Sequence, residues 1–172
     1  MRRHTHLLLD VVVPAEAEIT RRSNGEFVPG LLLAITISPS ERVLRGAQLA
    51  REDVESGFTT VRNLGHSGID GDVVLRDAIN AGRVPGPRML ASGRKLTAPG
   101  SYIQNLNPAI AAPIVQQEFL QLDSPDHARQ AVRANVFYNV DLIKISIDDD
   151  ITQAEATAIV DEAHRQHLGV YR

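Results

Sequence analysis

Two histidines near the amino terminus, His4 and His6, are the first residues whose types and spacing could do chemistry. They stand two positions apart and lead into the apolar run LLLDVVV at 7–13, which predicts a strand. Residues two apart on a strand point to the same side, so both imidazoles can reach one cation. Such a pair is also typical of a solvated chain end, so its chemistry depends on what the rest of the chain places beside it.

Lys144 is the second candidate, because it interrupts the apolar run DLIKISI at 141–147. A lysine in a buried strand costs free energy unless it is paired, modified or at a strand end. Either the ammonium reaches the surface along its apolar stem, or its pKa is depressed and the neutral amine can react or be modified. The three aspartates at 148–150 favour a solvated turn over a cation site.

His66 is the third candidate, because it follows a strand-like run and opens the glycine-rich segment GHSGIDGD at 65–72. A histidine there can face the mouth of a pocket. The segment lacks the spacing of both common phosphate-binding glycine loops, so a tight turn is favoured over a phosphate binder. The remaining histidines stand on expected helices among charged neighbours and are expected to be solvated: His127, His164 and His167.

The composition limits the classes of function. The chain has 172 residues, 43% of them hydrophobic and 23% charged, as in an ordinary soluble single domain. A net charge of −3 gives no nucleic-acid footprint, and the lack of cysteine excludes disulfides, thiolate metal sites and a cysteine nucleophile. Asp10 interrupts the one signal-like stretch, and no apolar run approaches the ~20 residues of a membrane span. We therefore expect no membrane partner. The compartment is left open, and cytoplasmic is the expectation for the chain as given, which has no convincing signal peptide.

The elements that must position these candidates alternate between strand and helix. Capping patterns predict helices that begin at Ser38, Asp72, Ser124 and Thr152. Residues 93–123 are expected to form a long, mostly irregular, lid-like stretch. Apolar or β-branched runs predict strands at 7–13, 58–64, 88–92 and 141–147, with a fifth strand beginning at Leu168.

This alternation predicts an α/β fold with a parallel sheet. Four strand–helix units and the start of a fifth strand amount to roughly half of a TIM-type (β/α)8 barrel, which needs about 250 residues. A small open doubly wound sheet is the alternative. Ligands bind at the carboxyl ends of the strands in both folds.

Several separate strings, in order, resemble the metal-dependent amidohydrolase superfamily, in its imidazolonepropionase-like and Xaa-Pro dipeptidase-like branch. They are GFTTVRNLG at 57–65, DAINAGRVPGPRMLASGRKLTAPGSY at 77–102, VDLIKI at 140–145 and IVDEAHRQHLGV at 159–170. The resemblance covers nearly all of 38–172. It implies a (β/α)8 barrel with His-x-His on the first strand and a carboxylated, metal-bridging lysine on the fourth. It also implies histidines on the fifth and sixth strands and an aspartate on the eighth.

Two stretches could supply the first strand of this resemblance. The stretch VPGLLLAITI at 28–37 would place Ile35 and Ile37 where the histidines belong, which would leave a dead site. The terminal HTHLLLD keeps both ligands. Members of the branch commonly place several tens of residues between His-x-His and the second-strand string. His6 lies 51 positions before Gly57 and Ile37 only 20, so the terminal alignment is favoured.

On that alignment the resemblance implies a metal-dependent, peptidase-like hydrolase that cleaves amide, peptide or other C–N bonds through a metal-activated water. The expected cofactor is one or two divalent ions, with zinc the expected metal, and the expected ligands are His4, His6 and carboxylated Lys144. The expected substrate is a small molecule or dipeptide-like compound. Its expected contacts are His66, Ser101 and Tyr102.

The departures from the resemblance matter as well. Asn63 stands where the branch usually has aspartate, and the later histidine and aspartate ligands have no counterpart. We therefore expect residues 1–172 to form one truncated barrel domain, with strands 1–4 and the start of strand 5 and no complete β-sandwich. Whether such a chain is an enzyme is open, and alone it is expected to be inactive. The alternative is a non-catalytic half-barrel that forms a homo-oligomer or binds another partner.

Overall fold

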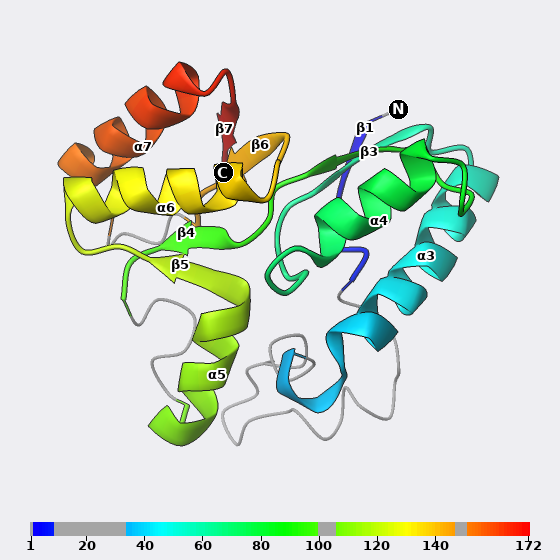
Figure 1. Cartoon of the computed structure of the whole chain (residues 1–172), viewed down its shortest axis with the longest axis horizontal. Helices are drawn as coiled ribbons and strands as arrows, with labels where there is room; N and C mark the ends of the chain where they lie inside the picture. Colours follow the sequence, from blue (N-terminus) through cyan, green and yellow to red (C-terminus); the bar gives the residue numbers. More distant parts are fainter. Residues whose placement is uncertain (1, 9–33, 100–105, 147–150) are drawn as a thin grey trace.

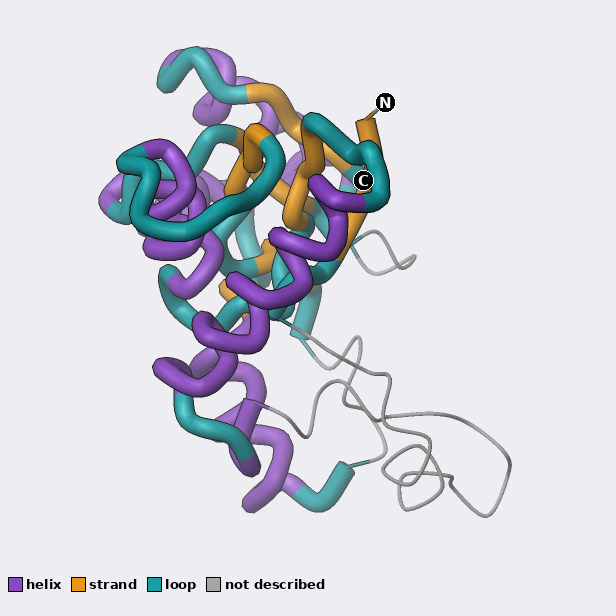
Figure 2. The backbone as a smooth tube through the Cα atoms, turned by 90° about the vertical axis from the view of Figure 1, so that its right-hand side faces the viewer, coloured by secondary structure: helices purple, strands orange, loops and turns teal. Residues whose placement is uncertain are grey.

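The computed structural model describes residues 2–8, 34–99, 106–146 and 151–172 (Figures 1 and 2). Strands and helices alternate through most of this part of the chain. In chain order the elements are β1 (Arg2–Thr5), α3 (Pro39–Glu55), β2 (Thr60–Asn63), α4 (Gly71–Asn80), β3 (Arg88–Ala91), β4 (Lys95–Thr97), α5 (Pro108–Glu118), β5 (Phe119–Gln121), α6 (Pro125–Phe137), β6 (Leu142–Lys144), α7 (Gln153–Arg165) and β7 (Gly169–Tyr171).

All strand pairs are parallel. β1, β2 and β3 lie side by side in that order, β4 pairs with β5, and β6 pairs with β7. β3 and β4 follow each other as two parts of the third strand. β6 is joined to both parts, because the amide of Asp141 donates to the carbonyl of Ala91 in β3, and Leu96 in β4 bridges Ile145. The order β1, β2, β3, β6, β7 therefore follows the chain without a reversal. This confirms the predicted α/β class and is the order of a barrel segment, not of a doubly wound sheet.

Two pairs of helices pack on these strands, and α5 lies apart from both pairs, next to β5 (Figure 1). α3 and α4 pack over β1–β3 around a cluster that includes Leu75, Val61 and Met89. α6 and α7 pack over β4, β6 and β7 around Ile143 and Ile159. Because side chains alternate along a strand, Arg62, Leu90, Lys144 and Tyr171 share the opposite, inner face. On that face the Arg62 guanidinium carbon lies 4.8 Å from the centre of the Tyr171 ring.

The capping patterns place three helix starts correctly. The hydroxyl of Ser38 accepts from the amide of Glu41, and that of Ser124 accepts from His127. At Thr152 the capping box is complete, because Glu155 both donates its amide to the Thr152 hydroxyl and accepts from the Thr152 amide at 2.8 Å. Side-chain oxygens thus satisfy helix amides that have no partner within the helix.

The first strand was predicted too late in the chain. It ends at Thr5, and Leu7 and Leu8 form a turn whose side chains are buried against α3 and α4. These leucines are apolar because they extend the helix-facing core, not because a strand continues. Residues 9–13 lie outside the described part. The correction moves the His-x-His pair from the start of its strand to the carboxyl end.

Two further predictions were wrong. Asp70, not Asp72, precedes α4, and Asp72 is fully buried. Residues 93–123 are not mostly irregular, since β4, α5 and β5 lie within them, although 100–105 are outside the described residues. The sequence hides α5 because apolar side chains lie on most of its sides and Pro113 stands inside it, so no amphipathic period marks it.

The position of β1 decides between the two alignments of the first strand. The strand beside β2 is β1, which carries His4 in register with Arg62. Residues 34–36, which the other alignment would place in a strand, are helical. The terminal alignment is therefore the one that the fold follows.

Candidate functional site

Four basic side chains gather around the carboxyl ends of β1, β2, β3 and β6. His6 follows β1, His66 follows β2, Lys95 begins β4, and Lys144 ends β6. The Nδ1 atom of His6 lies 3.1 Å from the carbonyl oxygen of Gly65, and the His6 and His66 rings meet edge to face at 5.0 Å between centroids. Of His4, the structure describes the backbone register. One edge of the fold thus carries three of the predicted ligands and contacts: His6, His66 and Lys144.

The backbone that carries His66 is tightly constrained. His66 has a φ of 58° and Gly65 a φ of 89°, both in the left-handed region that side chains disfavour. A Cβ atom at position 65 would lie 2.5 Å from Cγ of Lys95. Glycine is therefore required at position 65 for two reasons: the backbone is left-handed there, and the Lys95 side chain lies against it.

Lys95 is a site residue that the sequence interpretation missed. It is 4% exposed, and its Nζ lies 2.5 Å from Nε2 of His66. The signal that could have found it is the same as for Lys144: a lysine between buried neighbours in a short strand. Since Leu96 bridges Ile145, Lys95 and Lys144 are neighbours on adjacent parallel strands and share the inner face.

Burial and positive charge dominate the electrostatics of the site. The pKa of His66 is well below its ordinary value, chiefly because of burial and further because of Lys95, His6, Arg42 and Lys144. The imidazole is therefore neutral at physiological pH. Its Nδ1 atom is buried and has no hydrogen-bond partner in the described structure.

Lys144 is buried, with 9% of the residue exposed. Burial lowers its pKa, and the charge of Arg172 lowers it further. Of the two interpretations of this lysine, the one with a depressed pKa is supported. A neutral amine is the form that reacts with carbon dioxide.

A buried ion pair holds the loop that carries His66. The Arg42 guanidinium donates to the Glu118 carboxylate at 2.6 Å and to the His66 carbonyl at 2.7 Å. The second oxygen of Glu118 accepts from the amide of Gly68 at 3.3 Å. A carboxylate therefore occupies the loop amide that a phosphate would need, which argues against a phosphate site at 65–72.

Asn63 holds the same turn in place through hydrogen bonds of its side chain. Its Oδ1 accepts from the amide of Leu7 at 2.7 Å, and its Nδ2 donates to the Ser67 hydroxyl at 2.6 Å. An amide supplies one acceptor and one donor here, which a carboxylate cannot do. The departure from the aspartate of the resemblance therefore has a local structural use.

The donor set fits a divalent ion in part. Within the described ranges no group of three or more His, Cys, Asp or Glu side chains gathers to hold a metal. His6 and the buried amine of Lys144 are suitable in chemistry, since imidazole and carbamate oxygen both bind zinc-like ions. The predicted contacts Ser101 and Tyr102 lie outside the described residues, as do the aspartates at 148–150.

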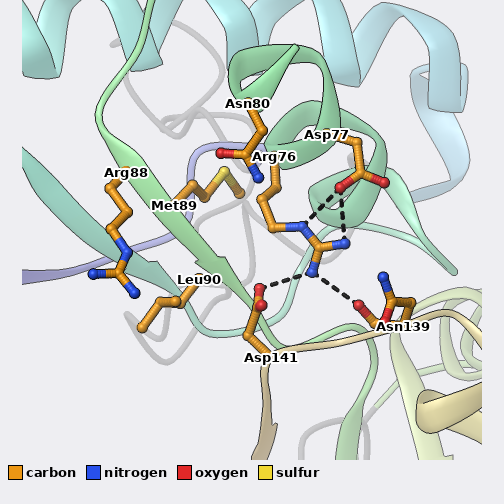
Figure 3. A pocket seen from close by; sticks show the side chains of 8 residues that line it. All are labelled: Arg76, Asp77, Asn80, Arg88, Met89, Leu90, Asn139 and Asp141. Carbon is orange, nitrogen blue, oxygen red and sulfur yellow. Dashed lines mark hydrogen bonds and ion pairs between the residues drawn. The ribbon is translucent and has the colours of Figure 1, made fainter.

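A separate polar pocket of about 310 Å³ lies at the amino ends of β3 and β6 (Figure 3). The guanidinium of Arg76 spans it, donating to Asp141 and to the carbonyl of Asn139 at 2.8 Å each, and to Asp77 at 2.9 Å. The Asp141 carboxylate also accepts from the amide of Ala91. The charge of Arg76 is thus satisfied by Asp77 and Asp141 within the pocket, as expected for the stabilising end of a barrel.

The sequential parallel strands, with helices between them, define a partial (β/α) barrel. Three solved structures are similar to it: the A. niger ochratoxinase, with a TM-score of 0.69 and 22% identity; a prolidase complexed with N-methylphosphonate-L-proline, at 0.68 and 22%; and a Xaa-Pro dipeptidase with methionine bound in its active site, at 0.64 and 23%. The matches cover 98%, 98% and 99% of this chain, but 41% of each of those chains.

The chain thus spans about two fifths of the length of these structures. At such identities the likeness shows the fold, and it confirms the predicted partial barrel. No protein-family model matches the sequence, and no curated protein matches it. No helix in the described part of the chain is long and apolar enough to cross a membrane.

Proposed function

We propose that this chain carries the first ligands of a metal-dependent hydrolase of the amidohydrolase type, which cleaves an amide, peptide or other C–N bond. The observation that carries the proposal is the position of the His-x-His pair and of Lys144. The pair stands at the carboxyl end of the first strand, and buried Lys144 at that of the fourth strand in the parallel order. Ligands of barrel enzymes come from this edge.

The proposed ligands are His4, His6 and Lys144, the last as a carbamate. They would hold one or two divalent ions, with zinc expected. Such a metal, when bound, supplies an activated water and polarises the scissile carbonyl. Two features of the chain support the arrangement: the depressed pKa of Lys144, which favours the amine that takes up carbon dioxide, and the hydrogen bond between His6 and Gly65, which orients its ring.

A small dipeptide-like compound is the proposed substrate class. The similar prolidase and Xaa-Pro dipeptidase support it, as does the position of His66 beside His6. Ser101 and Tyr102 are further proposed contacts. Since the chain spans about two fifths of those structures, turnover is proposed for a complete barrel and not for this chain alone.

Zinc titration of the purified chain, with and without bicarbonate, tests the metal assignment. We expect the His4→Ala, His6→Ala double variant and Lys144→Met each to weaken zinc binding at least about tenfold, which is a change of about 1.4 kcal/mol. Bicarbonate should add the mass of one carbon dioxide to the wild type but not to Lys144→Met, as read by native mass spectrometry.

His127→Ala is the matched control, because its histidine is exposed on α6 and paired with Asp123. It should bind zinc like the wild type. Unchanged zinc binding in the double variant would show that the metal assignment is wrong.

A second candidate is a non-catalytic half-barrel that associates with another copy. The observation in its favour is that, among the described residues, β1 pairs with β2 alone and β7 with β6 alone. Each leaves one row of backbone groups that can pair with a further strand.

A further inference from the structure

The guanidinium of Arg42 joins three segments that are far apart in the sequence. Its Nε atom donates to the carbonyl of Leu8 at 3.2 Å, Nη2 to the carbonyl of His66 at 2.7 Å, and Nη1 to the Glu118 carboxylate at 2.6 Å. Leu8 stands two residues after His6, so Arg42 connects the loop after β1 with the loop after β2. Arg42 is 1% exposed, so water does not compete for these donors.

Glu118, the last residue of α5, completes this arrangement from the other side. One carboxylate oxygen binds Arg42, and the other accepts from the amide of Gly68, inside the loop after β2, at 3.3 Å. The next residue, Phe119, meets the His66 ring edge to face at 6.1 Å between centroids. The end of α5 and the start of β5 therefore act on the loop after β2 at its backbone and at its histidine ring.

The loop after β1 is held by shape as well as by hydrogen bonds. The Leu8 side chain lies against two helical glycines: a Cβ atom on Gly46 of α3 would lie 3.1 Å from it, and one on Gly71 of α4 would lie 2.6 Å from it. The amide of Leu7 donates to a side chain of β2 at 2.7 Å. His6 is thus followed by two residues whose positions are fixed by β2, α3 and α4.

Stability alone does not explain the buried pair of Arg42 and Glu118. Desolvation offsets much of the attraction within a buried ion pair, and apolar residues of similar volume often stabilise a fold as well or better. Apolar residues cannot, however, bind the carbonyl and amide groups of two loops in fixed directions, as a planar guanidinium and a carboxylate can. The pair therefore indicates a requirement for geometry at the carboxyl ends of β1 and β2.

We propose that Arg42 and Glu118 are positioning residues for the metal site, and that they raise its affinity for a divalent ion by holding the loops after β1 and β2 in one arrangement. Neither side chain is a ligand, and both act through the backbone of these loops. Nδ1 of His6 lies 3.1 Å from the carbonyl oxygen of Gly65 in the other loop, so a shift between the loops changes the orientation of the ring. The effect on metal affinity rests on the proposed function, whereas the bracing of the two loops does not.

Zinc titration of the purified chain tests the effect on metal affinity. Glu118→Gln should weaken zinc binding about tenfold or more, the loss typical of removing an outer partner of a metal ligand, because the amide has one acceptor oxygen where the carboxylate has two. Arg42→Lys keeps the positive charge but loses the planar fork that binds three acceptors, so it should weaken zinc binding as much. Wild-type affinity in either variant would overturn the proposal.

Ile159→Ala is the matched control for lost stability, because Ile159 is fully buried where α7 packs over the strands, away from both loops. It should destabilise the fold but bind zinc like the wild type. Urea unfolding of each variant establishes that it is folded under the conditions of the titration. A loss of zinc affinity in Ile159→Ala equal to that in Glu118→Gln would show that the effect is one of stability and would contradict the positioning role.

Hydrogen exchange of the metal-free chain tests the bracing of the loops without any metal. The amides of Leu7 and Gly68 report on the two loops, since each donates to a side chain from another segment. In Arg42→Lys both amides should exchange at least tenfold faster relative to the amide of Ile159, and an unchanged ratio at either would refute the bracing. If the wild type shows this protection but binds no zinc, the metal function fails and the bracing stands. If Glu118→Gln binds zinc as tightly as the wild type, the positioning role fails and the metal function stands.

Discussion

The buried carboxyl group of Asp72 makes the stability of the fold depend on pH. Its carboxylate accepts from the amides of Ser92 and Gly93, at 3.0 and 2.9 Å, and thereby ties α4 to the end of β3. Burial raises its pKa, although these hydrogen bonds and that of Asn63 oppose the change. Ionised Asp72 is thus less favourable in the fold than in the unfolded chain.

The sign of the pH effect follows from the raised pKa. The stabilisation from protonated Asp72 is fully present below the unfolded pKa of about 3.9 and is lost as pH rises through the higher folded pKa. We expect the free energy of unfolding of the wild type, relative to Asp72→Asn, to fall as pH rises above about 4 and then to level off. Urea unfolding followed by circular dichroism over this range measures it. A difference independent of pH would contradict the interpretation.

The sequence indicated some site residues and not others for a physical reason. His66 and Lys144 were found because each follows or interrupts an apolar run, which is a local pattern. Asp72 and Glu118 stand on helices and are buried by segments far away in sequence, so their surroundings are set by packing. Local patterns carry no information on such contacts.

At the scale of elements, two glycines with the same backbone provide a matched experiment. Gly65 and Gly57 both have a φ of 89°, but a Cβ would meet Lys95 at position 65 and nothing within 4 Å at position 57. Gly57→Ala should cost about 1–2 kcal/mol, from the left-handed conformation alone. Gly65→Ala should cost a further 1–3 kcal/mol or so, because the Lys95 stem must move. Equal losses in urea unfolding would show that the contact with Lys95 is unimportant.

The Arg42–Glu118 pair joins α3 to α5, and both side chains are 2% exposed. Glu118→Gln should destabilise the fold by about 3–5 kcal/mol, because it leaves a buried guanidinium without its counter-charge. The exposed pair of Arg45 and Glu41 is the control, and Glu41→Gln should cost at most about 0.5 kcal/mol. Thermal unfolding of both variants measures the contrast. Similar losses would mean that the buried pair contributes no more than a surface one.

Helix starts and helix interiors differed in how well the sequence predicted them. The caps at Ser38, Ser124 and Thr152 were predicted because a cap is a contact between residues three apart. α5 was missed because it has no single apolar face to mark it. The first strand was placed too late because Leu7 and Leu8 resemble a strand but cover helices.

At the scale of the whole molecule, the strand–helix alternation was sufficient to predict parallel strands but not their grouping. The third strand position is divided into β3 and β4, and β6 joins it through single hydrogen bonds and one bridge. The break between β3 and β4 lies where the amides of Ser92 and Gly93 donate to Asp72, so it does not follow from strand propensity. The barrel order nonetheless follows from the chain order, because each new strand is added beside the last.

The outer edge of β7 gives a test of self-association. The Tyr171 carbonyl accepts from the amide of Ile145, so the backbone groups of Tyr171 face β6 and those of the preceding Val170 face outward. We expect sedimentation to show concentration-dependent dimers of the chain. Val170→Pro should reduce association at least tenfold, because it removes the outward N–H without breaking the ladder to β6. Val170→Ala loses the same packing against the core but keeps that N–H, so it should still associate. A chain that stays monomeric at every concentration would exclude the second candidate function and leave the metal site to be judged by its own titration.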